Sequence, residues 1–343
     1  MKHFIFLIVA VFTVMFLVYL NKDEVSTAGN DLSIKVYASK SFLDSWGPGP
    51  KLKEIFEKQT GQKVFYIEMP DPNLTFQKMN FDGEAAVGDA VIGLDQFDLV
   101  RVSDKIRWRA LESKMITPYQ KDFKLEKFER YFLPYDWAPI AFVTKSEYNH
   151  DLKKLDDLLQ VDLKNKIALE DPRTSSPGLQ FLYWVMRTKS ESEAIDFLKK
   201  LAKQAHSFSP SWSTAYGLFK QKQATLVLSY VTSPIYHLVE EKDASYRAIE
   251  FQEGHPLQIE FAGVPETCQN CDGAIQFVQF LQSPEAQKII MTKNYMLPVY
   301  KPAQEATAFD TIKMYPVIKG ALPTKEELTR WLNLWSDIRK NTD

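Results

Sequence analysis

The sequence predicts an α/β protein of two lobes with a ligand cleft between them. The chain has 343 residues, a length that favours two lobes over one hydrophobic core. Short apolar strands alternate with amphipathic helices, which is typical of parallel βαβ units. Two strands of the second half also stop in Ser and Thr residues and then open a helix, and this half repeats the strand, turn and helix order of the first.

The first half begins with an alternating strand at Leu32–Tyr37, followed by a loop rich in turn residues at 39–50. One amphipathic helix and two strands are expected next, and they are Lys51–Lys58, Lys63–Glu68 and Ala90–Leu94. In open α/β sheets the ligand lies beyond the carboxyl ends of the strands. Those ends here carry Ser39, Asp71 and Asp95.

Two long extended runs, near residues 134–146 and 256–264, are expected to join the lobes and to leave the cleft between them. The other expected strands of the second half are Lys166–Leu169 and Ala224–Ser229. Its expected helices are Leu152–Leu159, Leu179–Arg187, Ser192–Ala205, Thr214–Lys220, Pro234–Glu241, Ala274–Leu281, Pro284–Met291 and Leu328–Arg339.

Residues 1–28 are expected to be an export segment. Lys2 precedes an almost wholly apolar run from Phe4 to Leu20, and polar residues follow it. The run is long for a signal-peptide core and short for a membrane span, so a signal cleaved after Ala28 and an uncleaved inner-membrane anchor both remain open. In either case the chain works outside the cytoplasm, in the periplasm. Lobe 1 is expected to hold residues 29–140 and 260–310, and lobe 2 residues 141–259 with the helices of 311–343.

Composition excludes several classes of function. The net charge of -2 and the pI of about 6.3 offer no basic field for nucleic acid. None of the five His residues lies in a metal-ligand spacing, and no phosphate-binding loop or nucleophile motif occurs. The chain is therefore expected to bind a molecule rather than transform it, without a metal or a cofactor.

Both cysteines lie in the segment Cys268–Cys271. An exported chain meets an oxidising compartment, so a local structural disulfide is favoured there. A thioredoxin-like redox role would need the motif after a strand of a small βαβ domain, and here it follows Pro265 and opens an apolar helix.

Two turns suggest an anion site. Ser175 and Ser176 precede Pro177, and Thr232 and Ser233 stand in the equivalent place before the second helix. Helix N-termini of this kind offer N–H and hydroxyl groups to phosphate or carboxylate, although a plain helix cap is the competing interpretation. Nearby Arg173 would pair with such an anion or, alternatively, with Asp171.

Aromatic residues near these turns suggest a flat, positively charged ring as the other part of the ligand. Trp46, Trp212, Tyr230 and Tyr236 all lie in loops or at the ends of elements, although core packing is the alternative for each. Asp71 and Asp95 would balance the positive charge, or would act as caps and turns.

At these residues the chain resembles the periplasmic thiamine-binding proteins of ABC importers. The similarity covers nearly everything after the export segment, and its specific strings are Trp46-Gly47-Pro48-Gly49-Pro50 and Asp171-Pro172-Arg173-Thr174-Ser175-Ser176-Pro177-Gly178. The chain departs from the family at two places: Ser39-Lys40 replaces a Tyr-Asp pair, and Pro72 replaces the glycine of an Asp-Gly pair.

The resemblance implies a type II periplasmic-binding-protein fold, a monomer, and delivery of the ligand to a membrane permease. It implies that thiamine or one of its phosphates is captured by lobe closure. The alternatives are another small cationic or anion-tailed solute, a thiamine-acting enzyme, and a membrane-tethered sensor of the same fold. The expected ligand-binding residues are Trp46, Asp71, Asp95, Ser175, Ser176, Trp212, Tyr230, Thr232, Ser233 and Tyr236.

Overall fold

The computed structural model describes residues 33–85, 87–101, 106–111, 128, 130–148, 151–299 and 307–341. The expected export segment lies outside these residues. Within the described part of the chain, no helix is long and apolar enough to cross a membrane.

The strands follow the order β2-β1-β3-β9-β4-β7-β5-β6, and β8 and β10 both pair with β4. Lobe 1 is built on three strands that pair in parallel, namely β1 (Ile34–Ser39), β2 (Val64–Met69) and β3 (Ala90–Asp95). Lobe 2 is built on a second parallel set, namely β5 (Ile167–Glu170), β6 (Ser207–Ser209) and β7 (Leu226–Tyr230). The parallel units predicted from the sequence are therefore confirmed in both halves.

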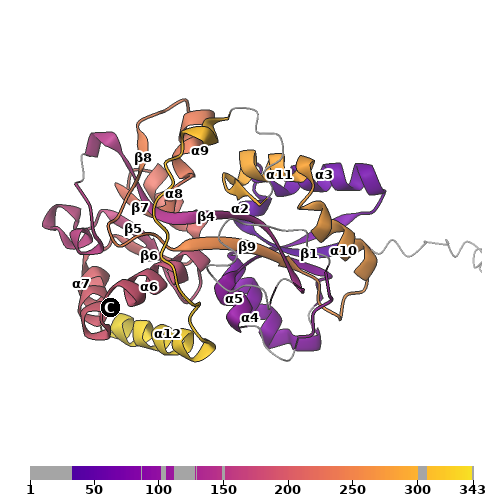
Figure 1. Cartoon of the computed structure of the whole chain (residues 1–343), viewed down its shortest axis with the longest axis horizontal. Coiled ribbons are helices and arrows are strands. Elements are labelled where there is room, and N and C mark those ends of the chain that lie inside the picture. Colours follow the sequence, from indigo (N-terminus) through magenta and orange to yellow (C-terminus); the bar gives the residue numbers. More distant parts are fainter. Residues whose placement is uncertain are drawn as a thin grey trace, which may run out of the picture. The chain divides into compact units, whose positions relative to one another are not determined.

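Two long antiparallel strands, β4 (Phe132–Lys145) and β9 (Leu257–Gly263), run between the two parallel sets (Figure 1). β4 pairs with β9 as far as Pro139 and with β7 from Ile140 onward, so one strand belongs to both lobes. The short strands β8 (Tyr246–Ile249) and β10 (Leu297–Pro298) complete the pairing along β4.

Helices surround each set of strands (Figure 1). Those of lobe 1 are α2 (Lys40–Leu43), α3 (Gly49–Thr60), α4 (Pro72–Asp82), α5 (Gln96–Arg101), α10 (Cys271–Phe280) and α11 (Pro284–Ile289), which runs into a π-helical turn at Ile290–Asn294. Those of lobe 2 are α6 (Ser176–Thr188), α7 (Glu191–Gln204), α8 (Trp212–Lys220), α9 (Ser233–Glu240) and α12 (Lys325–Lys340). Short 3₁₀ helices occupy Gly83–Ala85, Ser146–Tyr148, Leu155–Leu159, Val161–Leu163 and Ala308–Thr311.

Three helices of lobe 1 were not predicted from the sequence. α2 lies in the segment expected to be a loop, and the Ser39 hydroxyl accepts a hydrogen bond from the Phe42 N–H at its start. α4 lacks an apolar stripe, because its buried residues include the polar Asn73 and Thr75. α5 is only six residues long, which is too short for a helical period to be recognised.

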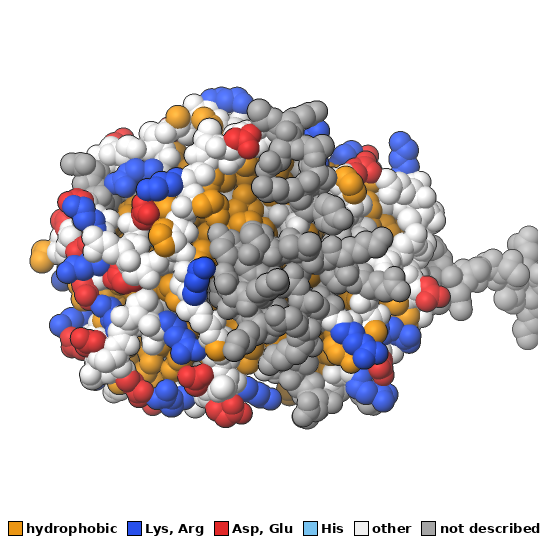
Figure 2. Space-filling model, viewed as in Figure 1, with side chains coloured by type: hydrophobic (Ala, Val, Ile, Leu, Met, Phe, Trp, Pro, Cys, Tyr) orange, Lys and Arg blue, Asp and Glu red, His pale blue; other side chains and the backbone are white. Residues whose placement is uncertain are grey.

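Each lobe has its own apolar core. In lobe 1 Phe42, Phe56 and Phe277 are almost fully buried among the strands and the helices α2, α3 and α10. In lobe 2 the C-terminal helix α12 inserts Trp331 and Trp335 against α6 and α7. The surface carries interspersed acidic and basic side chains on the face shown in Figure 2, in keeping with the small net charge.

Candidate functional site

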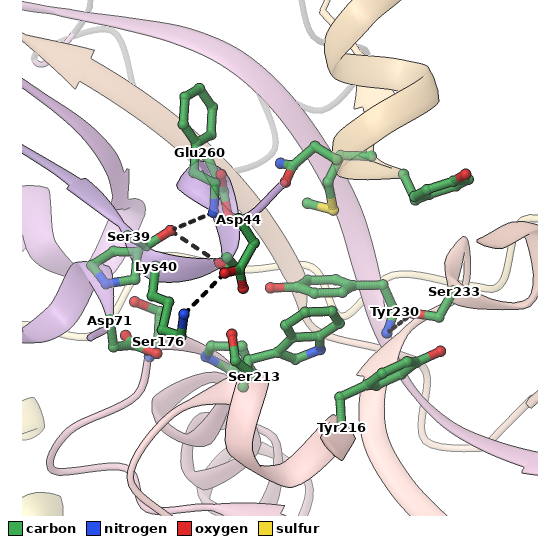
Figure 3. Close-up of a pocket in the computed structure, with 18 of the residues that line it drawn as sticks. Ser39, Lys40, Asp44, Asp71, Ser176, Ser213, Tyr216, Tyr230, Ser233 and Glu260 are labelled. Atoms are coloured by element: carbon green, nitrogen blue, oxygen red, sulfur yellow. Dashed lines mark hydrogen bonds and ion pairs between the residues drawn. The ribbon is translucent and has the colours of Figure 1, made fainter. Parts of the chain in front are cut away.

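A cavity of about 340 Å³ lies between the lobes. Lobe 1 supplies residues from the ends of β1 and β2 and from α2, and lobe 2 supplies residues from α6, α8, β7 and α9. Figure 3 shows Ser39, Lys40 and Asp71 on one side of this cavity and Tyr230 and Ser233 on the other. The volume suits a small organic ligand with a few fixed polar contacts.

Seven of the ten residues predicted to bind ligand lie on the cavity wall, and they are Trp46, Asp71, Ser176, Trp212, Tyr230, Ser233 and Tyr236. The other three, Asp95, Ser175 and Thr232, do not line it. Ser175 and Thr232 are fully buried at the N-cap positions of α6 and α9, where they form part of the turns that precede these helices.

Asp95 is held away from the cavity by its role as a cap. Its Oδ1 accepts hydrogen bonds from the N–H groups of Phe97 and Asp98, at 2.8 and 3.0 Å. Its Oδ2 accepts one from Gln180 Nε2 of α6 at 2.9 Å, which links the two lobes. Burial raises the pKa of Asp95 to about 8. Asp95 is therefore a cap, which was the alternative to ligand binding.

The first predicted anion turn already holds a carboxylate of the protein itself. Asp71 Oδ1 accepts hydrogen bonds at 3.1 Å from the N–H of Asn73 in lobe 1 and from the N–H of Ser176 in lobe 2. Burial raises the pKa of Asp71 to about 7, against the effect of these N–H groups and of the Ser175 hydroxyl. The Ser176 N–H is thus not free for a ligand. The buried Ser176 hydroxyl, which lines the cavity, has no partner among the described residues.

The second turn orders an aromatic wall. The Ser233 hydroxyl accepts from the Tyr230 N–H at 3.2 Å and lies 2.7 Å from the Ser229 hydroxyl. Ser229 in turn accepts from the Trp212 indole N–H at 2.9 Å. The turn that was expected to bind an anion therefore fixes the backbone and the ring that face the cavity.

The aromatic side chains come from both lobes. Trp212 stacks on Tyr216 with ring centres 4.7 Å apart, and Trp46 of lobe 1 lies 6.2 Å from Trp212. Tyr236 of lobe 2 meets Tyr295 of lobe 1 edge-on at 5.5 Å. A flat ring entering the cavity would thus meet aromatic faces on more than one side.

Behind this wall lies a polar support that sequence reasoning missed. The Tyr216 hydroxyl is 2.8 Å from His237 Nε2, and His237 Nδ1 is 2.6 Å from Glu241. Burial lowers the pKa of His237, so the neutral ring donates from Nδ1 to Glu241 and accepts from Tyr216. The spacing of four residues between His237 and Glu241 on one helix was the available signal.

Acidic and basic groups share the cavity wall. Glu260 of β9 accepts a hydrogen bond from the Tyr135 hydroxyl at 2.6 Å. Lys40 is paired with Asp44 at 2.9 Å, and Lys220 with Glu241 at 3.1 Å. Arg173 forms an ion pair with Asp171 at 2.6 Å, which was the alternative to anion binding.

Cys268 and Cys271 form a disulfide at the start of α10. Neither cysteine lines the cavity. The pairing agrees with the structural role that the sequence favoured.

Comparisons with known proteins agree with this architecture. Residues 99–316 match the family described as bacterial extracellular solute-binding protein. The thiamine-binding periplasmic protein of Brucella melitensis is 35% identical over 300 residues, covering 86% of this chain and 84% of that protein. The thiamine-binding periplasmic protein of Salmonella typhimurium is 32% identical over 311 residues, covering 88% and 92%.

The solved structure of a periplasmic thiamin binding protein superposes with a TM-score of 0.78 at 30% identity, covering 90% of this chain and 96% of that one. The fold is therefore the two-lobed type II fold of periplasmic binding proteins, as predicted. The chain belongs to the bacterial extracellular solute-binding proteins and, within them, to the group of the thiamine-binding periplasmic proteins.

Proposed function

We propose that this protein captures thiamine or one of its phosphates in the periplasm by lobe closure and delivers it to the permease of an ABC importer. The observation that carries the proposal is a cavity lined by aromatic rings of both lobes and by the carboxyl group of Glu260. Thiamine combines a cationic thiazolium ring, an aminopyrimidine ring and a hydroxyethyl tail. The relatives of this protein in Brucella melitensis and Salmonella typhimurium are thiamine-binding periplasmic proteins.

The chemistry of the wall supports a cationic ring. A desolvated cation over an aromatic face gains about 1–2 kcal/mol, and Trp212 and Tyr230 are held in place to provide such faces. Lys40 and the Ser176 hydroxyl stand near Asp71 on the side of lobe 1 and α6, where a phosphate tail would find donors (Figure 3).

Lobe closure follows from the two-sided wall. A ligand that touches Trp46 of lobe 1 and Trp212 of lobe 2 at once stabilises the closed arrangement over the open one. Release to a permease then requires only that the lobes separate. No bond chemistry is proposed, and both of the chain's cysteines are in the disulfide, which removes the thiol nucleophile that a thiamine-degrading enzyme would use.

Calorimetric titration of the purified protein, unfolded and refolded to remove carried ligand, tests the proposal. We expect one-to-one binding with a submicromolar Kd for at least one of thiamine, its monophosphate and its diphosphate. Choline, a cation without a ring system, is the control and should give no heat. Absence of binding by all three thiamine compounds, or equal binding of choline, would refute the proposal.

The partner is tested in a bacterium that lacks its own thiamine-binding protein. Expression of this chain should restore uptake of labelled thiamine only where a thiamine permease is also present. Uptake without the permease would contradict delivery to a permease, whereas an N-terminal segment retained on the mature protein with no permease needed would support the tethered-sensor alternative.

A further inference from the structure

Two side chains of β9 give the cavity a floor of hydrogen-bond acceptors. Gln258 and Glu260 are two residues apart on the strand, so they project from the same face, and both line the cavity. Tyr230 lines the same cavity, and Figure 3 labels it together with Glu260. We call Gln258 and Glu260 the acceptor floor.

The amide of Gln258 is oriented by its neighbour. Its Nε2 donates to Glu260 Oε1 at 3.1 Å, and the flipped amide would place its oxygen against the carboxylate. The carbonyl oxygen Oε1 is therefore the atom left over. It has no partner among the described residues, although Gln258 is only 1% exposed. A buried acceptor without a donor is costly, and a ligand N–H would remove that cost.

Glu260 is also kept as an acceptor. The Tyr135 hydroxyl and the Gln258 amide both donate to it. Asp136 of β4 is its direct neighbour across the strand pair. Burial and the neighbouring Glu260 raise the pKa of Asp136 well above its usual range, and burial also raises the pKa of Glu260. Asn294 Nδ2 donates to Asp136 at 2.7 Å and fixes that side chain. Glu260 thus presents hydrogen-bond acceptor atoms to the cavity.

We infer that Gln258 and Glu260 recognise an amino group on a flat ring of the ligand and so hold that ring against β9. This inference rests on the proposed function, because the aminopyrimidine ring of thiamine has such a group. Its two N–H bonds match the free Gln258 carbonyl and the Glu260 carboxylate. The acceptor floor would then distinguish an amino-substituted ring from one that presents an oxygen at the same place.

The test compares thiamine with oxythiamine, in which an oxo group replaces the amino group of the pyrimidine. Oxythiamine keeps the thiazolium ring and the tail but turns an oxygen toward the acceptor floor. We expect the wild-type protein to bind thiamine at least about tenfold more tightly, because the analogue leaves a buried acceptor facing another acceptor.

Substitutions of Gln258 and Glu260 test whether the acceptor floor causes the preference for thiamine over oxythiamine. Gln258→Met removes the free carbonyl at similar size, and the thiamine preference should fall to about threefold or less. Glu260→Gln is the second variant, and it should reduce the preference as well. Gln96→Met is the matched control: Gln96 is equally buried and bonds to the backbone of β9 at Leu257 and Ile259, but it does not line the cavity. It should lower the melting temperature and leave the preference unchanged.

The outcomes separate the two proposals. Equal affinity of the wild-type protein for both compounds would overturn the inference and leave the proposed function standing. Wild-type selectivity that survives in folded Gln258→Met and Glu260→Gln proteins would also overturn it. No binding of thiamine, of its two phosphates or of oxythiamine would overturn the proposed function, and the inference with it.

Discussion

Trp212 depends on contacts at both its edge and its face. Its indole N–H is bonded to Ser229, and its ring is stacked on Tyr216, which is itself bonded to His237. The ring therefore keeps its orientation before a ligand arrives, and less conformational entropy is lost on binding.

Trp212→Ala is expected to weaken thiamine binding by about 1–3 kcal/mol, because an aromatic face of the cavity is lost. Trp212→Phe keeps a ring but loses the bond to Ser229, so its loss should be smaller. Calorimetry on all three proteins measures the difference. Equal affinity of the alanine variant and the wild-type protein would show that the ligand does not contact this wall.

Asp71 makes stability depend on pH. Because its native pKa is raised to about 7 from 3.8, the native state binds more protons than the unfolded state between these values, and stability falls as pH rises through that window. Asp71→Asn removes the titrating group. We expect the free energy of unfolding of this variant to fall less between pH 4 and pH 7.5 than that of the wild-type protein, by about 1–3 kcal/mol. Denaturant unfolding at the two pH values measures this difference.

The pH dependence of stability of Asp71→Asn must be compared with that of the wild-type protein, because His255 changes stability with pH in the opposite direction to Asp71. Burial lowers the pKa of His255 to about 4, so it contributes stability that is lost as pH falls below about 6.5. Asp151→Asn, at a carboxylate whose side chain is 82% exposed, controls for the change in net charge. Parallel pH profiles of the Asp71→Asn and wild-type proteins would contradict the prediction.

At the scale of elements, the start of α6 is set by its close approach to β5. A Cβ atom at Gly178 would lie 2.6 Å from the carbonyl oxygen of Glu170 and 2.8 Å from the carbonyl carbon of Asp171. The glycine thus allows Ser176 to reach both Asp71 and the cavity. This explains why a glycine follows Ser175, Ser176 and Pro177.

Gly178→Ala should therefore destabilise the protein by about 1–3 kcal/mol, because the backbone of β5 must move to admit the methyl group. Gly217→Ala in α8 is the matched control, since its Cβ would meet nothing within 4 Å, and it should be neutral or stabilising by up to about 1 kcal/mol. Denaturant unfolding of both variants measures the contrast. Similar stabilities of the two variants would count against a tight contact at Gly178.

At the scale of the whole molecule, the lobes are held together by polar contacts on two sides of the cavity. On one side Gln77 Nε2 donates to the Arg173 carbonyl at 2.8 Å, close to the Asp71–Ser176 bond. On the other the Tyr295 hydroxyl donates to Glu240 at 2.8 Å. Separation of the lobes would break these bonds, so we expect them to act on the opening equilibrium.

Tyr295→Phe removes the second of these bonds and keeps the ring against Tyr236. Ligand dissociation should become about five- to twentyfold faster, with little change in the association rate. Stopped-flow tryptophan fluorescence measures both rates. Tyr315→Phe is the control, because its hydroxyl bonds to the Ala248 carbonyl and it does not line the cavity, so its rates should match those of the wild-type protein.

Much of the fold was predictable because many of its strands and helices show local sequence patterns. Strands such as Ala90–Asp95 and helices such as Glu191–Gln204 have clear apolar periods or caps, and they were predicted to within one residue or two. Helix α4 was missed because polar residues occupy part of its buried face. The exact lobe boundaries and the roles of the individual site residues stay predictions.

The sequence by itself determined most of the strands and helices, the places where strands end in polar turns, and the aromatic residues beside those turns. Only the tertiary structure decided what those turns hold. Asp71 bonds to Ser176 across 105 residues, and Tyr135 bonds to Glu260 across 125. Such pairs depend on which strand ends meet, and no local period or spacing records that meeting. For the same reason the sequence did not predict Gln258 and Glu260 as site residues, and only the position of β9 shows that they line the cavity.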